Sequence, residues 1–248
     1  MSSLNPIGSP FIELPTVDST NNYAMGLVYA AMARHGTVVF AHEQTNGRGQ
    51  RTRKWLSEPQ ANIAISVIIE PAGIELSKMF LLSKTIATGV LAFFNEFVSE
   101  NIAIKWPNDI YWRDRKAGGI LIENLVKGTE WKFAIAGIGL NINQTFFEGL
   151  EKKAVSLKQI TGGTYDTLML AKKLCTHLEK QFSKFYKTPE LIVEEYHINL
   201  YKRGQKVKFK KEARVFEASV KDVSNMGELI VEHAMEERFN VGEVEWML

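Results

Sequence analysis

The sequence contains a single cysteine, Cys175, which excludes an intrachain disulfide and a cysteine-rich metal site. This scarcity fits a reducing compartment, so we expect a cytoplasmic location. An uninterrupted apolar run of about 18 residues, long enough to cross a bilayer, does not occur, and no basic start leads into an apolar stretch. Export and membrane insertion are therefore not expected.

An excess of charge of either sign is also lacking. Thirty Lys and Arg residues balance 28 Asp and Glu residues, which leaves a formal net charge of +2 at pH 7. A protein that binds nucleic acid over a broad surface usually carries a clear basic excess, so any positive charge needed for function must be concentrated locally. The histidines, whose spacing does not suit a metal site, are His35, His42, His177, His197 and His233.

Apolar residues, in contrast, are plentiful: 45% of the 248 residues are hydrophobic, enough for one large core and a smaller one. Cap side chains at residues 18–21 predict a helix that runs to about Arg34. Further helices are predicted at 76–98, at 167–186 and after Pro189. Strands, which are rich in β-branched and aromatic residues, are predicted at 37–41, 61–69, 102–104, 110–112, 119–126 and 131–142. The expected fold is α/β (α+β), with a mixed, mainly antiparallel sheet covered by helices.

The sequence pattern changes after Gly204, where short runs of alternating apolar and polar residues are separated by turn residues such as Asn225 and Gly227. This pattern predicts a small separate β-barrel. No internal repeat or low-complexity segment interrupts the chain. We therefore expect two domains, a larger α/β domain over residues 1–202 and a β-barrel domain over residues 203–248.

The most informative segment is the arginine-rich loop, residues 44–55, which carries four cations within residues 48–54. Arginine forks bind phosphate or carboxylate oxygens with paired hydrogen bonds, and glycine lets backbone amides come close to a ligand. Trp55 adds a flat face for stacking. Taken alone, the segment is equally compatible with a solvated basic loop or a patch that binds nucleic acid.

A second group of polar residues is formed by two neighbouring segments, 105–109 (Lys-Trp-Pro-Asn-Asp) and 116–123. Proline fixes the turn after a short strand, and Asn108 and Asp109 then present an amide and a carboxylate that suit ribose, metal or amine contacts. The plainer interpretation is a polar turn followed by a bend at Gly118 and Gly119.

Two shorter motifs complete the pattern. Residues 137–143 place Gly137 and Gly139 in a predicted strand, where a ligand can approach the backbone closely. The third glycine and following helix of a dinucleotide fingerprint are missing. Ser19, Thr20 and Asn21 offer hydroxyl and amide groups for a polar ligand, although Ser19 or Thr20 equally suits a helix cap.

Together, in this order, these motifs resemble those of biotin protein ligases. The resemblance covers about residues 19–143, and its usual loop signature is matched by Gly47, Arg48, Gly49, Arg51, Arg53 and Trp55. Two positions depart from it, because Gln50 stands where arginine is expected and Thr52 where glycine is frequent. The lost fork puts the tight retention of an activated intermediate in doubt.

The resemblance implies a class II synthetase-like catalytic domain, an SH3-like C-terminal barrel, and an enzyme that activates biotin with ATP and Mg²⁺ to biotinyl-AMP. It implies transfer of biotin to one lysine of a biotin carboxyl carrier protein, and a homodimer is compatible with it. Some members carry an N-terminal winged helix that binds DNA. Because the first motif begins near Asp18, we expect no such domain and no repressor role.

The resemblance also assigns roles to single residues. The catalytic residues it implies are Lys116, Arg51, Arg48 and Asp109. The implied biotin-binding residues are Ser19, Thr20, Asn21, Gln44, Gly47, Arg48, Arg51, Lys116, Gly118, Gly119, Gly137 and Gly139. The implied ATP-binding residues are Arg51, Arg53, Trp55, Asn108, Lys116 and Asn141. No metal ligand is expected from the protein itself.

Two rival functions remain open. A lipoate ligase or octanoyl transferase resembles this fold, but the transferase uses a cysteine nucleophile, and Cys175 lies in a predicted helix far from the motifs. The arginine-rich loop also favours biotin. A noncatalytic RNA-binding module around residues 48–54 predicts a continuous basic face, which the balanced charge of the chain does not support.

Overall fold

The computed structural model describes residues 5–71, 73–148 and 153–247, which form two sheets flanked by helices. The larger sheet has seven strands in the order β1-β2-β3-β7-β6-β5-β4. Its strands are β1 (Phe11–Val17), β2 (Val38–Gln44), β3 (Ile63–Ile69), β4 (Ile102–Lys105), β5 (Asp109–Trp112), β6 (Arg115–Lys127) and β7 (Glu130–Leu140). The pair β1–β2 is parallel and the other pairs are antiparallel, which confirms the predicted mixed, mainly antiparallel sheet.

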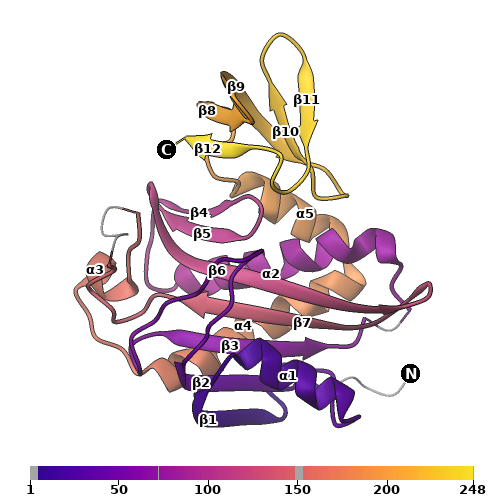
Figure 1. The fold of residues 1–248 in the computed structure, drawn as a ribbon, viewed down its shortest axis with the longest axis vertical. Helices are drawn as coiled ribbons and strands as arrows, with labels where there is room; N and C mark the ends of the chain where they lie inside the picture. The colour runs from indigo at the N-terminus through magenta and orange to yellow at the C-terminus, as the bar shows by residue number, and fades with distance from the viewer. Residues whose placement is uncertain (1–4, 72, 149–152, 248) are drawn as a thin grey trace.

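Helices cover both faces of this sheet (Figure 1). They are α1 (Thr20–Tyr29), the 3₁₀ turn η1 (Leu76–Lys78), α2 (Met79–Phe94), α3 (Leu157–Thr161), α4 (Thr167–Lys187) and α5 (Pro189–Ile198). In the figure α1 lies in front of the sheet, and α2 and α4 lie behind it. Successive strand residues point to opposite faces, so Val38 packs in the large core under α2 and α4, whereas Val39 packs under α1. The α1 face therefore has little apolar cover and leaves room for a site.

The apolar helix α2 with η1, Leu76–Phe94, is long and hydrophobic enough to cross a membrane by composition alone. Most of its residues are buried, and it packs against α4, α5 and the sheet. Burial on nearly all sides explains this composition, because a helix that is hydrophobic all round suits the core of a large domain.

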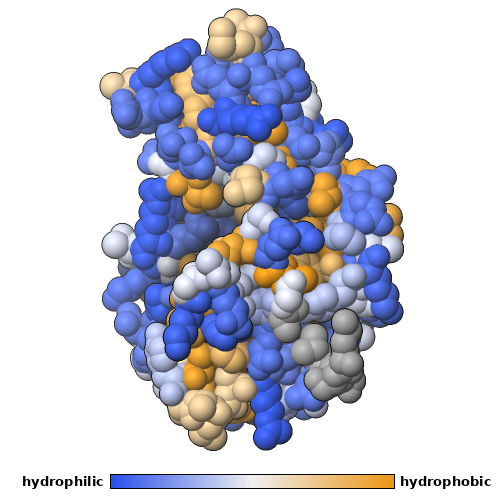
Figure 2. All heavy atoms as spheres, turned by 90° about the vertical axis from the view of Figure 1, so that its right-hand side faces the viewer, coloured by the Kyte–Doolittle hydropathy of each residue, from blue (hydrophilic) through white to orange (hydrophobic). Residues whose placement is uncertain are grey.

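The second sheet is antiparallel, with five strands in the order β11-β10-β9-β8-β12. Its strands are β8 (Lys206–Lys211), β9 (Arg214–Val223), β10 (Leu229–Glu232), β11 (Glu236–Phe239) and β12 (Glu245–Met247). It sits beyond β4 and β5 at the top of Figure 1, and its surface in Figure 2 is mostly hydrophilic. The buried Lys84 of α2 donates to the Val223 carbonyl, and Trp106 donates to the Gly227 carbonyl. These contacts join the second sheet to α2 and to the turn between β4 and β5. The domain division at residue 202 stays a prediction.

Several elements differ from the sequence-based expectations. Helix α1 ends at Tyr29 instead of near Arg34, because Ala31 takes a positive φ of 56° and the following amides bond back to Leu27. Strand β1, the short helix α3 and strands β11 and β12 were not predicted. The C-terminal sheet, with β11 and β12 at its two ends, fits the predicted small β domain.

Candidate functional site

A cavity of about 520 Å³ opens on the α1 face of the large sheet, within the usual size range of ligand pockets. The start of α1, the arginine-rich loop and strands β4 to β7 line it. Its lining includes most of the site residues predicted from the sequence. These are Ser19, Thr20, Asn21, Gln44, Arg48, Arg53, Trp55, Asn108, Asp109, Lys116, Gly119, Gly137, Gly139 and Asn141.

Three predicted residues are not part of this lining: Gly47, Arg51 and Gly118. Gly47 shapes the base of the arginine-rich loop, since a Cβ atom there would lie 2.5 Å from the Trp55 carbonyl oxygen. Gly118 lies on the opposite face from Gly119, where a Cβ atom would lie 2.6 Å from the Leu140 side chain. Both glycines are explained by packing, and their assignment to biotin stays a prediction.

One end of the cavity is rich in hydroxyl and amide groups, and the ion pair of Arg48 with Glu123 adjoins it. The Gln44 side-chain oxygen accepts from the backbone nitrogen of Thr20 at 2.8 Å and from its hydroxyl at 3.1 Å. Ser66 donates toward the Thr20 hydroxyl at 2.7 Å and the Asn21 amide oxygen at 2.5 Å. Ser19 occupies the N-cap position, but its side chain makes no cap hydrogen bond. These side chains are thus held in fixed orientations beside the cavity.

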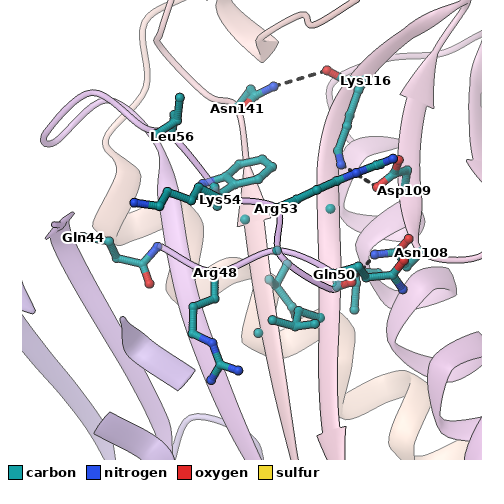
Figure 3. Close-up of a pocket in the computed structure, with 18 of the residues that line it drawn as sticks. Gln44, Arg48, Gln50, Arg53, Lys54, Leu56, Asn108, Asp109, Lys116 and Asn141 are labelled. Atoms are coloured by element: carbon teal, nitrogen blue, oxygen red, sulfur yellow. Dashed lines mark hydrogen bonds and ion pairs between the residues drawn. The ribbon is translucent and has the colours of Figure 1, made fainter. Parts of the chain in front are cut away.

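The other end of the cavity is basic. Lys116 Nζ lies 2.6 Å from Asp109 Oδ1, and in Figure 3 Arg53 extends toward the same carboxylate. Burial lowers the pKa of Lys105, with a smaller opposing contribution from Asp109. Among the residues that the structure describes, six Lys and Arg side chains and a single carboxylate, that of Asp109, line the cavity. Such an excess of positive charge in a partly enclosed space attracts anions strongly.

Strand β7 connects these two ends. A Cβ atom on Gly137 would lie 2.2 Å from Asn21 Oδ1, and one on Gly139 would lie 2.5 Å from the Trp55 ring. The two glycines are successive residues on one face of a strand, so they lie roughly 6.8 Å apart. The indole N–H of Trp55 is buried without an acceptor, a cost that a ligand acceptor would relieve. Glycine is required at both positions because the side chains above them touch the backbone.

The two asparagines predicted to contact ATP already serve the protein backbone. Asn108 donates from its side chain to the Ile120 carbonyl oxygen, which fixes the turn between β4 and β5 against β6. Asn141, which is buried, donates to the carbonyl oxygens of Lys116 and Val155, each at 3.2 Å. Asn141 thus fixes the backbone of Lys116, and Asn108 fixes that of Ile120. A direct contact of either residue with ATP stays a prediction.

The arginine-rich loop folds as a narrow hairpin. Trp55 donates its backbone N–H to Gly47 at 3.0 Å, and Gly49 donates to Arg53 at 2.9 Å. Arg51 lies at the tip with a φ of 59°, and its guanidinium donates to the Val241 carbonyl of the second sheet at 3.1 Å. The structure therefore directs Arg51 toward the C-terminal sheet rather than into the cavity.

Comparison with known protein families agrees with this geometry. The model of the biotin/lipoate A/B protein ligase family matches residues 13–142, which include the cavity's loop and strands. The chain belongs to this family. The match covers just over half of the chain, and it confirms the family resemblance inferred from the motifs.

Individual relatives give the same result. The bifunctional ligase/repressor BirA of Bacillus subtilis is 33% identical over 156 residues, which cover 62% of this chain and 48% of the relative. The biotin–[acetyl-CoA-carboxylase] ligase of Mycobacterium tuberculosis is 26% identical over 81% of this chain and 76% of the relative. The chain thus spans about half the length of several of the curated relatives it matches.

A solved structure of the biotin protein ligase from Aquifex aeolicus, in complex with biotin and ATP, has a TM-score of 0.80. Its sequence identity is 26%, and the match covers 96% of this chain and 98% of that chain. The similarity therefore extends over both sheets, including the C-terminal strands that carried no motif of their own. It confirms the predicted class of fold.

Some residues of the site were missed by sequence reasoning. Glu123, which binds Arg48, and Ser66, which binds Asn21, were not singled out. Tyr111, Phe147 and Lys153 also line the cavity. Glu123 and Ser66 lie in apolar strands, β6 and β3, whose hydrophobic pattern predicts burial and no function. A polar residue within such a strand was the one sequence feature that could have pointed to them.

The Arg51 contact leads to a prediction about Gly242. A Cβ atom on Gly242 would lie 1.0 Å from the Arg51 guanidinium, so Gly242→Ala must displace Arg51. We expect trypsin to cleave after Arg51 about fivefold faster, because the tip loses a hydrogen bond from a charged group. The matched control is Gly204→Ala, which has a similar positive φ and nothing within 4 Å. Equal cleavage of the two variants would show that the contact does not hold the loop.

Proposed function

We propose that this protein is a biotin protein ligase, which activates biotin with ATP and transfers it to a lysine of an acceptor protein. The observation that carries the proposal is the two-ended cavity, with hydroxyl and amide groups at Thr20, Asn21 and Gln44 and with cations around Lys116. Biotin has the matching chemistry, since a neutral ureido ring lies at one end and a carboxylate at the other. The names of the relatives and the biotin and ATP complex of the Aquifex protein support the same ligands.

In the first step, a carboxylate oxygen of biotin attacks the α-phosphorus of ATP. A new P–O bond forms, the bond to the β-phosphate oxygen breaks, and biotinyl-AMP and pyrophosphate result. Two anions must approach each other, so Lys116, Arg53 and Lys105 would lower the barrier by placing positive charge beside both. The pairing of Lys116 with Asp109 keeps that ammonium group in place.

In the second step, the amine of the acceptor lysine attacks the acyl carbon, an amide bond forms, and AMP leaves. A free lysine has a pKa of about 10.4, so an acceptor amine is mostly protonated at neutral pH. Asp109 lies at the basic end of the cavity, where its carboxylate would orient or deprotonate that amine. This role belongs to the proposal.

Magnesium is the remaining component that the proposal requires. Among residues 5–71, 73–148 and 153–247, no group of three His, Cys, Asp or Glu side chains is arranged to hold a metal ion. Asp109, the one carboxylate among the described lining residues, is paired with Lys116. The residues therefore fit a magnesium ion that arrives on the phosphates of ATP and neutralises their charge there.

The octanoyl transferase alternative is not favoured by the state of Cys175. This thiol is buried in α4, and burial raises its pKa to about 12, so it is not a thiolate nucleophile near neutral pH. Lipoate remains the nearest competing substrate. Relatives from Mycobacterium tuberculosis, Homo sapiens and Paracoccus denitrificans carry names of biotin ligases, which favours biotin.

The experiment that tests this function is transfer of labelled biotin to the isolated biotin-accepting domain of a carboxylase. We expect ATP-dependent labelling of one lysine, and no labelling when that lysine is replaced by arginine. Formation of biotinyl-AMP without transfer would restrict the function to activation. A homodimer and a cytoplasmic location remain predictions, to be checked by sedimentation and by cell fractionation.

Gln50 provides a prediction about the intermediate. It lines the cavity where the family signature has arginine, so Gln50→Arg adds a cation beside the bound adenylate. We expect release of biotinyl-AMP to slow by about tenfold, since a hydrogen bond to a charged group contributes about 1.5 to 3 kcal/mol. Release is measured by chasing labelled intermediate with excess unlabelled biotin. An unchanged release rate would show that residue 50 does not determine how tightly the enzyme retains biotinyl-AMP.

A further inference from the structure

The carboxylate of Glu123 on β6 gathers side chains from two distant segments. Arg48 of the arginine-rich loop donates to both of its oxygens, at 2.8 and 3.0 Å. Asn21 at the start of α1 donates to it at 2.8 Å. Arg48 also donates to Asn22 at 2.9 Å. Glu123 thus joins the loop, the helix and the sheet at a single point.

We propose that Glu123 is a positioning residue, which fastens the arginine-rich loop over the cavity by holding Arg48. The inference rests on the proposed function and assigns Arg48 a different role from the one that the family resemblance implies. Arg48 is then a tether of the loop, and it supplies no charge to the reacting groups.

The geometry makes this a firm attachment. Exposed ion pairs usually contribute little, but a bidentate arginine–carboxylate pair within a network is the exception. The Glu123 side chain is 25% exposed, and its second partner, Asn21, is itself fixed by Ser66 inside the fold. Arg48 is therefore attached to a rigid strand through groups that have few other orientations.

The direction of Arg48 separates it from the reaction. In Figure 3 its guanidinium points away from Lys116 and Asp109, whereas Arg53 points toward them. Its charge is already matched by Glu123, so it adds little positive potential at the far end of the cavity. Arg53, Lys105 and Lys116 are among the lining cations that lie toward that end.

A tether and a transition-state residue predict different kinetics. Holding the loop in place before the ligand arrives removes an ordering cost from binding, so loss of the tether raises KM. Once saturating ligand has closed the loop, the chemical step is unaffected. Loss of a group that stabilises the transition state would lower kcat instead.

The first test is the kinetics of biotinyl-AMP formation by Arg48→Met, Glu123→Gln and the double variant. We expect KM for biotin to rise about tenfold in each single variant, with kcat within about threefold of the parent. The double variant should be no worse than the poorer single one, because both changes break one contact. A hundredfold loss of kcat in Arg48→Met, or additive effects, would overturn the proposal.

The second test needs no substrate. Trypsin is added to the ligand-free protein, and cleavage after Arg51, Arg53 and Lys54 is followed by mass spectrometry. We expect Glu123→Gln to speed cleavage of the loop about tenfold, because the open form of the loop is more populated. The matched control is Glu130→Gln. It removes the carboxylate of a glutamate that is paired with Lys132 at the start of β7, where the chain turns from β6 into β7.

The two tests separate the inference from the proposed function. If Glu123→Gln speeds cleavage of the loop but the parent protein makes no biotinyl-AMP, the tether proposal stands and the proposed ligase function is rejected. Cleavage equal to that of the Glu130→Gln control would reject the tether, whatever the enzymatic result. Partial restoration of KM by Arg48→Lys, which keeps one charged contact, would further support the tether, since a structural defect elsewhere would not respond to it.

Discussion

Replacing Lys116 by alanine is expected to slow biotinyl-AMP formation by about a hundredfold or more at saturating biotin and ATP. Lys116 lies at the basic end of the cavity, where Asp109 holds its ammonium group at 2.6 Å. Its Nζ also lies 3.1 Å from the position of a Cβ atom on Gly119, so the backbone there leaves space for the lysine. Removing one preorganised donor to a developing charge typically costs about 2.7 to 4 kcal/mol. Single-turnover kinetics measure this effect directly.

The matched control for Lys116 is Lys132→Ala. Lys132 on β7 is also paired with a carboxylate, Glu130, but that pair lies outside the cavity lining. We expect this control to adenylate biotin at the parental rate and both variants to keep the parental melting temperature within a few degrees. A folded Lys116→Ala protein whose single-turnover rate stays within a fewfold of the parent would show that Lys116 is not a catalytic residue.

Gly137→Ala is expected to weaken biotin binding by about ten- to a hundredfold. The added methyl group would lie 2.2 Å from Asn21 Oδ1, so the buried amide must leave its position between Ser66 and Glu123. Two neutral hydrogen bonds to the ligand, each worth about 0.5 to 1.5 kcal/mol, are then lost or misdirected. Titration calorimetry with biotin alone gives the change without any contribution from ATP.

The control for this substitution is Gly26→Ala, on the same helix as Asn21. Its added methyl group meets nothing within 4 Å, and alanine favours a helix over glycine, so stability should rise slightly and biotin affinity should not change. If Gly137→Ala binds biotin as tightly as the Gly26→Ala control, then Asn21 and Gly137 do not form the wall of the biotin site.

Much of the fold follows from local sequence patterns. The runs of β-branched residues in β3, β6 and β7 and the helical spacing of α2 and α4 identify those elements without tertiary information. Strand β1 was missed because its sequence, Phe11–Val17, contains Pro15 and lacks a buried alternating face. Such a sequence is tolerated because β1 lies at the edge of the sheet, where proline removes no ladder bond that is needed.

Some residues of the candidate site can likewise be predicted from the sequence, and others cannot. Short motifs name the cavity residues that lie on adjacent turns and strands, such as Asp109 and Lys116. They do not name partners that only the fold brings together. Arg48 lies 75 positions from Glu123, and Arg51 lies 190 positions from Val241. The loop motif therefore identifies Arg48 and Arg51, but only the structure shows that they bind Glu123 and the Val241 carbonyl.

The central claim, that biotin is the activated acid, is tested most directly by exchange of labelled pyrophosphate into ATP. The exchange requires formation and reversal of an acyl-adenylate, and it needs no acceptor protein. The purified chain should exchange label with biotin and show no comparable exchange with lipoate or octanoate, because the hydroxyl and amide end of the cavity suits a ureido ring. Exchange with lipoate that equals or exceeds that with biotin would contradict the account.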